Sequence, residues 1–208
     1  MFDIQTQLYE GKDIRFGPLD YEKDPEIEAR WTHDSEFMRM MDTVAARPMS
    51  AAMVKKQYEK LEKQIDENKN LFHFAIRARD DDRLIGKAVV QWIEWANGNA
   101  FLRLGIGAAQ DRCKGYGSQA LQMLLRFCFA ELNLFRLTAM VPEYNVAAIA
   151  LLKKFGFVEE VRRRKALERD GRRWDMLVFG LLKDKWLGQA KPALPKGHQD
   201  DASQPEGA

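Results

Sequence analysis

The sequence predicts an α/β (α+β) fold in which one mixed sheet carries helices on both faces. Segments typical of strands alternate with amphipathic segments typical of helices. Three consecutive strands are joined by short turns, which predicts an antiparallel meander, and a strong helix links the meander to the next strand. The chain has 208 residues, 46% of them hydrophobic, which is enough for one sizeable core. One domain is therefore expected.

The first half of the chain contains an opening strand, helices and the meander. The strand "DIRFGPL" ends at a Gly-Pro pair, and Ser50 is placed to cap a helix whose apolar stripe runs from Val54 to Ile65. The meander consists of "LFHFAIR", "RLIGKAVVQWIEW" and "AFLRLGI". Asn97-Gly98 predicts the hairpin turn between the last two strands, and the tryptophans of "WIEW" are expected to pack in the core and the hairpin.

The second half continues as helix, strand, helix and two strands. A helix is predicted from the spacing of five apolar residues, which are Leu121, Leu124, Leu125, Cys128 and Leu132. The strand "LFRLTAMV" follows, and Asn145 caps a short helix that Gly156 closes. Two strands then surround "RDGR". We expect a single domain over residues 1–188, and a disordered tail over residues 189–208 because that stretch is rich in Pro, Gly and polar residues.

Composition argues against several classes of function. The 33 Lys and Arg residues nearly balance the 31 Asp and Glu residues, so we expect no nucleic-acid partner. No long apolar run or leader pattern is seen, so we expect no membrane partner. Two cysteines, Cys113 and Cys128, suggest no disulfide framework, and a cytoplasmic location is expected. The three histidines lack zinc-ligand spacing, so no metal site is expected.

Three phosphate-binding patterns are relevant to the stretch from Gly105 to Gly117. The Walker pattern requires Gly-Lys-Ser/Thr before its helix, but the chain has Lys114-Gly115-Tyr116. A dinucleotide fingerprint beginning at Gly105 would need its third glycine at Gln110. The remaining pattern is Arg-x-x-Gly-x-Gly ahead of a helix, where glycines let an anion approach the backbone and the first helical turn attracts it. A loop with exposed cations and no ligand is the alternative.

Two motifs together resemble the GNAT superfamily of acyl-CoA N-acyltransferases. They are "LGIGAAQDRCKGYGSQAL" and, further along, "NVAAIALLKKFGF". The resemblance is to the branch that contains ribosomal-protein N-terminal acetyltransferases and spermidine acetyltransferases, and it covers nearly the whole domain. It implies a mostly antiparallel twisted sheet in which one parallel pair, residues 100–107 and 134–141, splays apart.

The resemblance also implies acetyl-CoA as cosubstrate and a set of residues that hold it. Backbone groups near three residues would pair with the pantetheine arm like an added strand. The residues near the pantetheine arm are Ile106, Gly107 and Ala108. The pyrophosphate would be held by the amides of Cys113, Lys114, Gly115, Tyr116, Gly117 and Ser118, assisted by the cations of Arg112 and Lys114. Asn145 would face the cofactor arm.

The chain departs from the family where relatives carry their acid and base. No carboxylate occurs from Trp95 to Gln110, and Leu152 occupies the position of the tyrosine that protonates the thiolate in relatives. The substitute catalytic candidates are Glu94, Glu143 and Tyr144, each of which has a structural role as its alternative. Positioning of the reactants contributes much to an acyl transfer, so a site without a dedicated base is still credible.

The expected function is transfer of an acetyl group from acetyl-CoA to a primary amine, by direct attack in a ternary complex. The acceptor is a protein or peptide N-terminus or a small polyamine-like amine, and a homodimer is possible. Residues 31–48 are expected to border the acceptor, with three acids, Asp34, Glu36 and Asp42, available to attract a cationic amine. The alternatives are an acyl-CoA-binding or regulatory module with weak or no activity, and use of another acyl-CoA donor.

Overall fold

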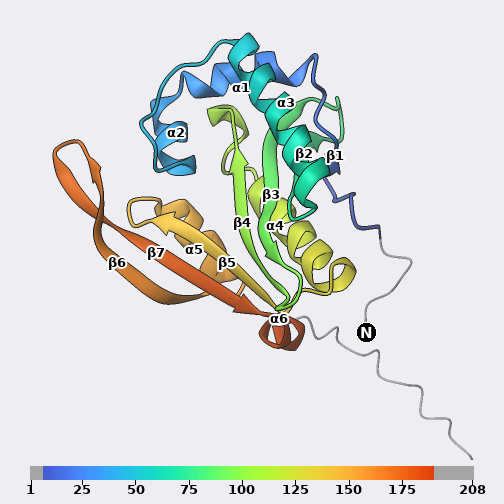
Figure 1. The fold of residues 1–208 in the computed structure, drawn as a ribbon, viewed down its shortest axis with the longest axis vertical. Helices are drawn as coiled ribbons and strands as arrows, with labels where there is room; N and C mark the ends of the chain where they lie inside the picture. Colours follow the sequence, from blue (N-terminus) through green and yellow to red (C-terminus); the bar gives the residue numbers. More distant parts are fainter. Residues whose placement is uncertain (1–6, 190–208) are drawn as a thin grey trace, which may run out of the picture.

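A computed structural model describes residues 7–189 of the chain and consists of one twisted sheet with helices on both faces (Figure 1). The sheet has seven strands in the order β1-β2-β3-β4-β5-β7-β6. Their bounds are β1 Ile14–Gly17, β2 Phe72–Ala78, β3 Leu84–Glu94, β4 Asn99–Ile106, β5 Arg136–Pro142, β6 Val158–Arg169 and β7 Arg172–Leu182. The helices are α1 Asp24–Thr32, α2 Ser35–Met41, α3 Ala51–Asn68, α4 Tyr116–Arg126, α5 Val146–Lys154 and α6 Lys183–Gln189. The tail expected over residues 189–208 lies outside the described residues, apart from Gln189 at the end of α6.

The strands β4 and β5 are parallel, whereas every other neighbouring pair in the sheet is antiparallel. They pair only where residues 99–102 lie beside residues 136–139. Beyond Leu102 and Ala139 the two strands separate, as the pale green and yellow ribbons of Figure 1 show. The expected sheet with one splayed parallel pair is confirmed.

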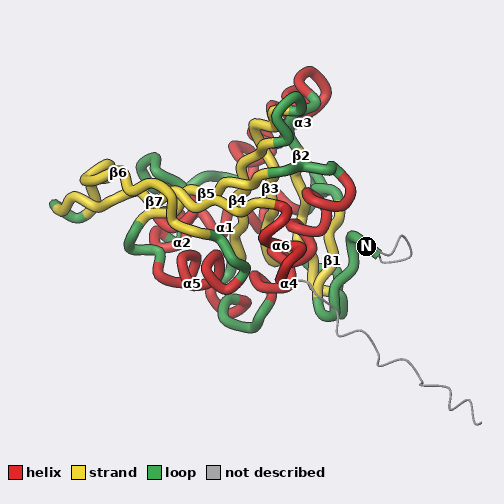
Figure 2. The backbone as a smooth tube through the Cα atoms, turned by 90° about the horizontal axis from the view of Figure 1, so that it is seen from below, coloured by secondary structure: helices red, strands yellow, loops and turns green. Residues whose placement is uncertain are grey.

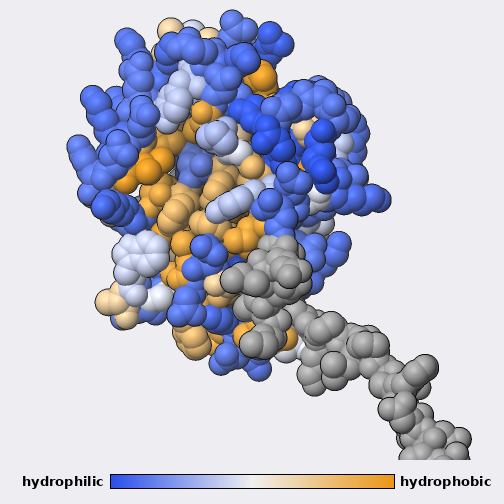
Figure 3. Space-filling view, turned by 90° about the vertical axis from the view of Figure 1, so that its right-hand side faces the viewer, coloured by the Kyte–Doolittle hydropathy of each residue, from blue (hydrophilic) through white to orange (hydrophobic). Residues whose placement is uncertain are grey.

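The two faces of the sheet are covered by different helices. The largest apolar cluster joins one face to α4 and α5, and it contains fully buried residues such as Leu124, Phe129 and Phe179. On the other face, one smaller cluster joins β2 and β3 to α1 and α2, and a second joins α1 to α3. Figure 2 shows α3 and α4 on opposite sides of β2 and β3. Viewed from the flank, apolar residues gather in the middle of the surface and hydrophilic residues surround them (Figure 3).

Polar side chains cap three of the helices and fix where they begin. Ser50 accepts the Met53 N–H at 3.3 Å, and Asn145 accepts the Ala148 N–H at 3.1 Å. Both predicted caps are confirmed. Asp34 caps α2 by accepting the N–H groups of Glu36 and Phe37 at 3.0 and 3.1 Å. The segment 31–48 therefore contains a helix where the sequence pattern had indicated only a stretch bordering the cleft.

The predicted hairpins form with glycine in the left-handed region. Gly98 has φ 64° between β3 and β4, and Gly171 has φ 69° between β6 and β7. At the second turn Asp170 also has a positive φ, 53°, which matches a type I′ turn. The turns bring β4 beside β3 and fold the long β6–β7 hairpin across the end of the sheet (Figure 1).

Within the described residues, none of the helices is long and apolar enough to cross a membrane.

Candidate functional site

The segment between β4 and α4 forms a loop of irregular backbone. A 3₁₀ turn at Ala109–Asp111 follows β4, and the chain then passes through Cys113 at φ 61° and Gly115 at φ 87°. The first hydrogen bond of α4 runs from the Gln119 N–H to the Gly115 carbonyl at 3.1 Å. The amides of residues 116–118 precede it and have no carbonyl four residues back within the helix. A run of N–H groups at the positive end of a helix results, and it is suited to an anion.

The two loop glycines leave room beside this backbone. A Cβ atom at Gly115 would have no atom within 4 Å, and one at Gly117 would meet only Leu151, at 3.8 Å. The surface beside the loop backbone is therefore open at these two positions. Any side chain at position 115 would enter this space and would also be strained by the positive φ.

The two cations of the loop lie differently. Arg112 folds back, donating to the carbonyls of Ile106 at 3.3 Å and Gly107 at 2.6 Å, and to Asp34 at 2.7 Å. Lys114 has an exposed side chain whose Nζ is 4.0 Å from the carboxylate of Asp111. Arg112 thus ties the loop to the start of α2, and Lys114 is the cation that extends from it.

The free edge of β4 lies beside the loop. The Gly107 N–H donates to Ile85 of β3 at 2.9 Å, so its backbone faces β3. Backbone groups alternate in direction along a strand, so those of Ile106 and Leu104 face the gap toward β5. Both residues lie beyond Leu102, the last residue of β4 that pairs with β5.

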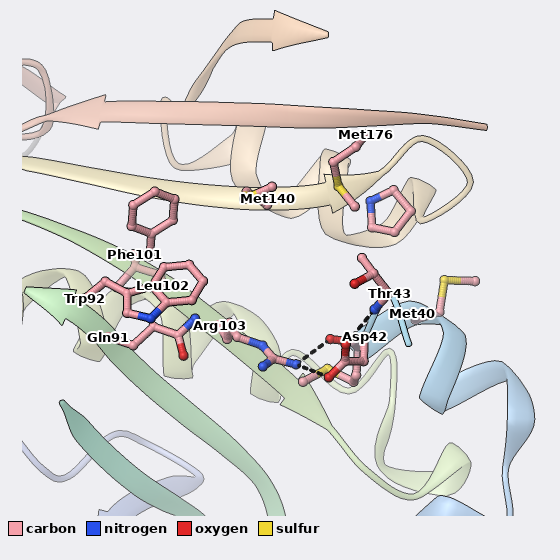
Figure 4. Close-up of a pocket in the computed structure, with 12 residues that line it drawn as sticks. Met40, Asp42, Thr43, Gln91, Trp92, Phe101, Leu102, Arg103, Met140 and Met176 are labelled. Atoms are coloured by element: carbon pink, nitrogen blue, oxygen red, sulfur yellow. Dashed lines mark hydrogen bonds and ion pairs between the residues drawn. The ribbon is translucent and has the colours of Figure 1, made fainter. Parts of the chain in front are cut away.

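A cavity of about 220 Å³ lies at the point where β4 and β5 separate. Eight of its lining residues are apolar, and they come from the end of α2 and from the strands β3, β4, β5 and β7 (Figure 4). The lining residues are Met40, Met41, Asp42, Thr43, Gln91, Trp92, Phe101, Leu102, Arg103, Met140, Pro142 and Met176.

The cavity has one ion pair, between Arg103 and Asp42, at 3.1 Å (Figure 4). Burial alone would raise the pKa of Asp42. The Val44 N–H, the charge of Arg103 and the Thr43 N–H outweigh burial, so the pKa of this carboxyl lies below its usual value. Asp42 is therefore ionised at neutral pH, but its oxygens already have partners.

The end of α2 is fixed over the separated strands. Tyr144 donates its hydroxyl to the Arg39 carbonyl at 2.9 Å, and Asn145 donates its amide to the Met40 carbonyl at 3.2 Å. Met41 lies against Gly105 so closely that a Cβ at position 105 would overlap its sulfur. Residues from both sides of the gap between β4 and β5 thereby hold α2.

The three catalytic candidates from the sequence are not brought together. Glu94 accepts the side-chain amides of Asn97 and Asn99 at 3.2 and 3.3 Å, within the β3–β4 turn and at the opposite end of β4 from the loop. Glu143 accepts the Asp175 N–H at 3.0 Å and pairs with Arg162 at 3.4 Å. Neither lines the cavity. These contacts, and that of Tyr144 with α2, favour structural roles.

The acids expected to attract a cationic amine are also occupied. Asp34 caps α2 and pairs with Arg112, and Asp42 pairs with Arg103. The expectation that Asp34 and Asp42 are available to attract an amine is not supported, because both flank α2 and already have partners. Leu152, at the position of the tyrosine in relatives, is buried in the main apolar cluster.

Sequence reasoning missed most of the residues around the cavity. Met140 and Met176 look like ordinary core positions in their strands. Trp92, expected to pack internally, is 58% exposed and lies edge-on to Phe101 with ring centroids 5.1 Å apart. Arg103 offered a signal, because a cation in "AFLRLGI" interrupts an otherwise apolar strand.

Comparison with known proteins identifies the class to which this fold and site belong. The family model described as "Acetyltransferase (GNAT) domain" matches residues 14–158. Uncharacterized N-acetyltransferase p20 of Bacillus licheniformis is 33% identical over 115 residues, which are 55% of this chain and 64% of that protein. The prophage-derived uncharacterized N-acetyltransferase YokL of Bacillus subtilis is 29% identical over 153 residues, 74% of this chain and 82% of that protein.

Among solved structures, spermidine N-acetyltransferase from Vibrio cholerae in complex with CoA and spermine has a similar fold. Its TM-score is 0.71 at 20% identity, covering 84% of this chain and 98% of that one. The chain belongs to the GNAT acetyltransferase family. The resemblance inferred from the two sequence motifs and the expectation of an acetyltransferase are confirmed.

Proposed function

We propose that the protein transfers an acetyl group from acetyl-CoA to a primary amine. The observation that carries the proposal is the adjacency of three features: the amide-lined loop before α4, the unpaired edge of β4, and the cavity between β4 and β5. They offer, in order, a place for a pyrophosphate, for an extended amide-containing arm and for an acceptor.

Residues of the loop and of β4 would hold the acyl donor. The N–H groups of residues 113–118 would bind the pyrophosphate, with Lys114 as the cation that can reach it. Arg112 would act from behind, holding the loop against Asp34 and the carbonyls of β4. The backbone of Leu104 and the N–H of Ile106 would pair with the pantetheine amides, because these groups face the gap, whereas the Ile106 carbonyl and both backbone groups of Gly107 already have partners.

The reaction is a nucleophilic substitution at the thioester. The lone pair of the neutral amine attacks the carbonyl carbon, a C–N bond forms, and the C–S bond breaks with its electron pair going to sulfur. The amine nitrogen loses a proton and the thiolate gains one, giving an N-acetyl amide and free CoA. Because the carboxylate of the cavity is paired with Arg103, the chain's contribution would be mainly orientation and exclusion of water.

The test is release of free CoA thiol, with mass-spectrometric detection of the acetylated product, for acetyl-, propionyl- and succinyl-CoA against amino acids, peptides and polyamines. We expect turnover with acetyl-CoA that depends on the amine. Turnover only with propionyl- or succinyl-CoA would show that acetyl-CoA is not the donor.

A second candidate function is that of an acyl-CoA-binding module without transferase activity. Two observations favour it: the cavity has no unpaired carboxylate among its lining residues, and Leu152 replaces the tyrosine of relatives. Binding of acetyl-CoA in calorimetry, with no thiol release across the panel, would establish this function and contradict the transferase.

A further inference from the structure

The cavity at the separated strands has the chemistry to select among amines. It includes Leu102 and Arg103 from β4 and Met140 and Pro142 from β5, at and just beyond the last paired residues of the two strands. An amine bound there lies beside the gap in which β4 presents its free edge. The inference that follows rests on the proposed acetyl transfer and concerns which amine enters.

The apolar part of the lining fits a single bulky side chain. Four of the lining residues are methionines, whose flexible thioethers adapt to differently shaped apolar groups. Phe101 and Trp92 add aromatic surface on one wall (Figure 4). The volume of about 220 Å³ is smaller than the roughly 300–1,000 Å³ typical of sites for drug-sized ligands.

The charged part of the lining does not suit a polycation. Asp42 is the one carboxylate among the residues that line the cavity, and its two oxygens accept from Arg103 at 3.1 Å and from the Thr43 and Val44 amides at 2.7 and 3.2 Å. The pair with Arg103 is neutral overall. A polyamine would bring several ammonium groups into the cavity and would find no free carboxylate to replace their hydration.

Further cations surround the opening. Arg169 donates to the Thr43 and Val44 carbonyls at 2.5 and 3.1 Å, which folds the β6–β7 hairpin over this side of the cavity. Arg163 pairs in register with Met176, so both project from the same face of the sheet. No ion pair of Arg163 occurs among residues 7–189. This rim repels polycations and tolerates neutral or anionic groups.

Arg103 can receive the group next to the reacting nitrogen. Its Nη2 atom donates to the Met41 carbonyl at 2.7 Å and to Asp42 at 3.1 Å, and its side chain is 41% exposed. Guanidinium carries five N–H donors in a planar fork, so donors on Nε and Nη1 remain for an oxygen acceptor. A carboxylate or carbonyl attached to the α-carbon of an α-amine is such an acceptor.

The protonation of the amine points in the same direction. An α-amine at a peptide N-terminus has a pKa near 8, so about a quarter of it is neutral at pH 7.5, whereas an alkylamine with a pKa near 10.4 is neutral in only about one molecule in a thousand. Without a free carboxylate to act as base, the α-amine is far better supplied as a nucleophile.

We infer that the acceptor is the α-amine of an amino acid with a bulky apolar side chain, free or at a peptide N-terminus, and not a polyamine. The apolar side chain occupies the methionine-lined part of the cavity, and Arg103 binds the adjacent carboxylate or carbonyl oxygen.

The experiment compares kcat/KM with acetyl-CoA for methionine, leucine, glycine, spermidine, and peptides that begin with Met, Leu or Gly. We expect apolar α-amines to exceed their glycine counterparts by about 10- to 150-fold, the effect expected from burying one large apolar side chain. Spermidine should fall at or below glycine. Free amino acids against peptides distinguish the two sources of the α-amine.

Two variants test the roles assigned to Arg103 and to the methionines that line the cavity. Arg103→Gln should raise KM for apolar α-amines at least 10-fold and leave the Kd of acetyl-CoA unchanged. Met176→Ala should reduce the preference for Met over Gly, while Met53→Ala, on the outer face of α3 and 41% exposed, should not. If Met176→Ala fails to fold, Arg103→Gln still decides, because its side chain is partly exposed.

The inference and the proposed function fail in different ways. Spermidine turned over as well as apolar α-amines would overturn the inference and leave acetyl transfer standing, as would equal rates for Met and Gly acceptors. No product with any amine, measured beside intact acetyl-CoA binding, would overturn the proposed function and the inference with it.

Discussion

Arg83 and Asp111 form a two-pronged ion pair in which Nη1 and Nη2 lie 2.6 and 2.7 Å from the two carboxylate oxygens. Asp111 is 1% exposed and ends the 3₁₀ turn after β4, whereas Arg83 immediately precedes β3. The loop before α4 is thereby anchored to the neighbouring strand by a bond between side chains far apart in the sequence.

Arg83→Ala should destabilise the protein by about 2–3 kcal/mol, because it removes both hydrogen bonds to the buried carboxylate of Asp111 and leaves it only the distant charge of Lys114, at 4.0 Å. The melting temperature should fall by about 5–10 °C in calorimetry. Arg173→Ala is the matched control, since its ion pair with Glu168 is exposed on both sides and should contribute less than about 1 kcal/mol. Equal losses in the two variants would contradict the anchoring role.

The same pair predicts a dependence on pH. The hydrogen bonds and charge of Arg83 hold the pKa of Asp111 below its usual value against the effect of burial. A lowered pKa in the folded state means that the stabilisation is present above the unfolded-state pKa near 4 and is lost as the pH falls through the lower folded value. In denaturant unfolding between pH 6 and pH 2, Arg83→Ala should therefore lose less stability than the unaltered protein.

Gly115→Val should abolish or greatly weaken acetyl-CoA binding. The substitution places a branched side chain in the open space beside the loop and strains a backbone with φ 87°. Gly171→Val is the control, because Gly171 also has a positive φ, 69°, and also has nothing within 4 Å of a Cβ, but lies in the β6–β7 turn. Both variants should lose about 1–2 kcal/mol of stability from the backbone alone. Calorimetry that shows unchanged CoA affinity for Gly115→Val would refute the loop assignment.

Iodoacetamide should label Cys113 and spare Cys128 in the folded protein. Cys113 is exposed within the loop, whereas Cys128 is fully buried and its burial raises the pKa of the thiol. Mass spectrometry should find one adduct per chain under native conditions and two in denaturant. Saturating acetyl-CoA should slow the labelling of Cys113, and an unchanged rate would argue against cofactor binding over these amides.

His73 should remain neutral down to strongly acidic pH. Burial, followed by the charges of Lys87 and Arg103, lowers its pKa to about 3. Because the folded pKa is below the unfolded value near 6.5, the unfolded state binds the extra proton, and stability declines as the pH falls from about 6.5 toward 3. His73→Leu should flatten this decline in denaturant titrations, and His33→Leu, at an exposed position, should not. NMR observation of His73 titrating near pH 6.5 would contradict the prediction.

Local patterns in the sequence predicted much of the fold. The caps at Ser50 and Asn145, the turn glycines and the loop before α4 each depend on neighbouring residues, so periodicity and turn chemistry predict them. The helix α2 was missed because its cap, Asp34, is followed by a short methionine-rich stretch without an apolar stripe long enough to detect.

The contacts of the site depend on residues distant in sequence and were mostly hidden. Arg112 reaches Asp34, which lies 78 positions away, so the pattern around Arg112 showed a cation beside glycines and not a clamp on α2. The cavity is assembled from α2 and four strands, and its methionines have the spacing of ordinary strand residues. The residue types in a strand do not show whether its side chains line a cavity or pack in the core.

Trp31 of α1 lies flat against the end of β4, where a Cβ atom on Gly107 would overlap the indole ring. Substitutions at these two positions are therefore coupled. A larger residue at 107 is compatible with the fold only when residue 31 becomes smaller. A library that redesigns the loop before α4 must therefore also vary Trp31 of α1. In related sequences, a larger residue at 107 should occur together with a smaller residue at 31.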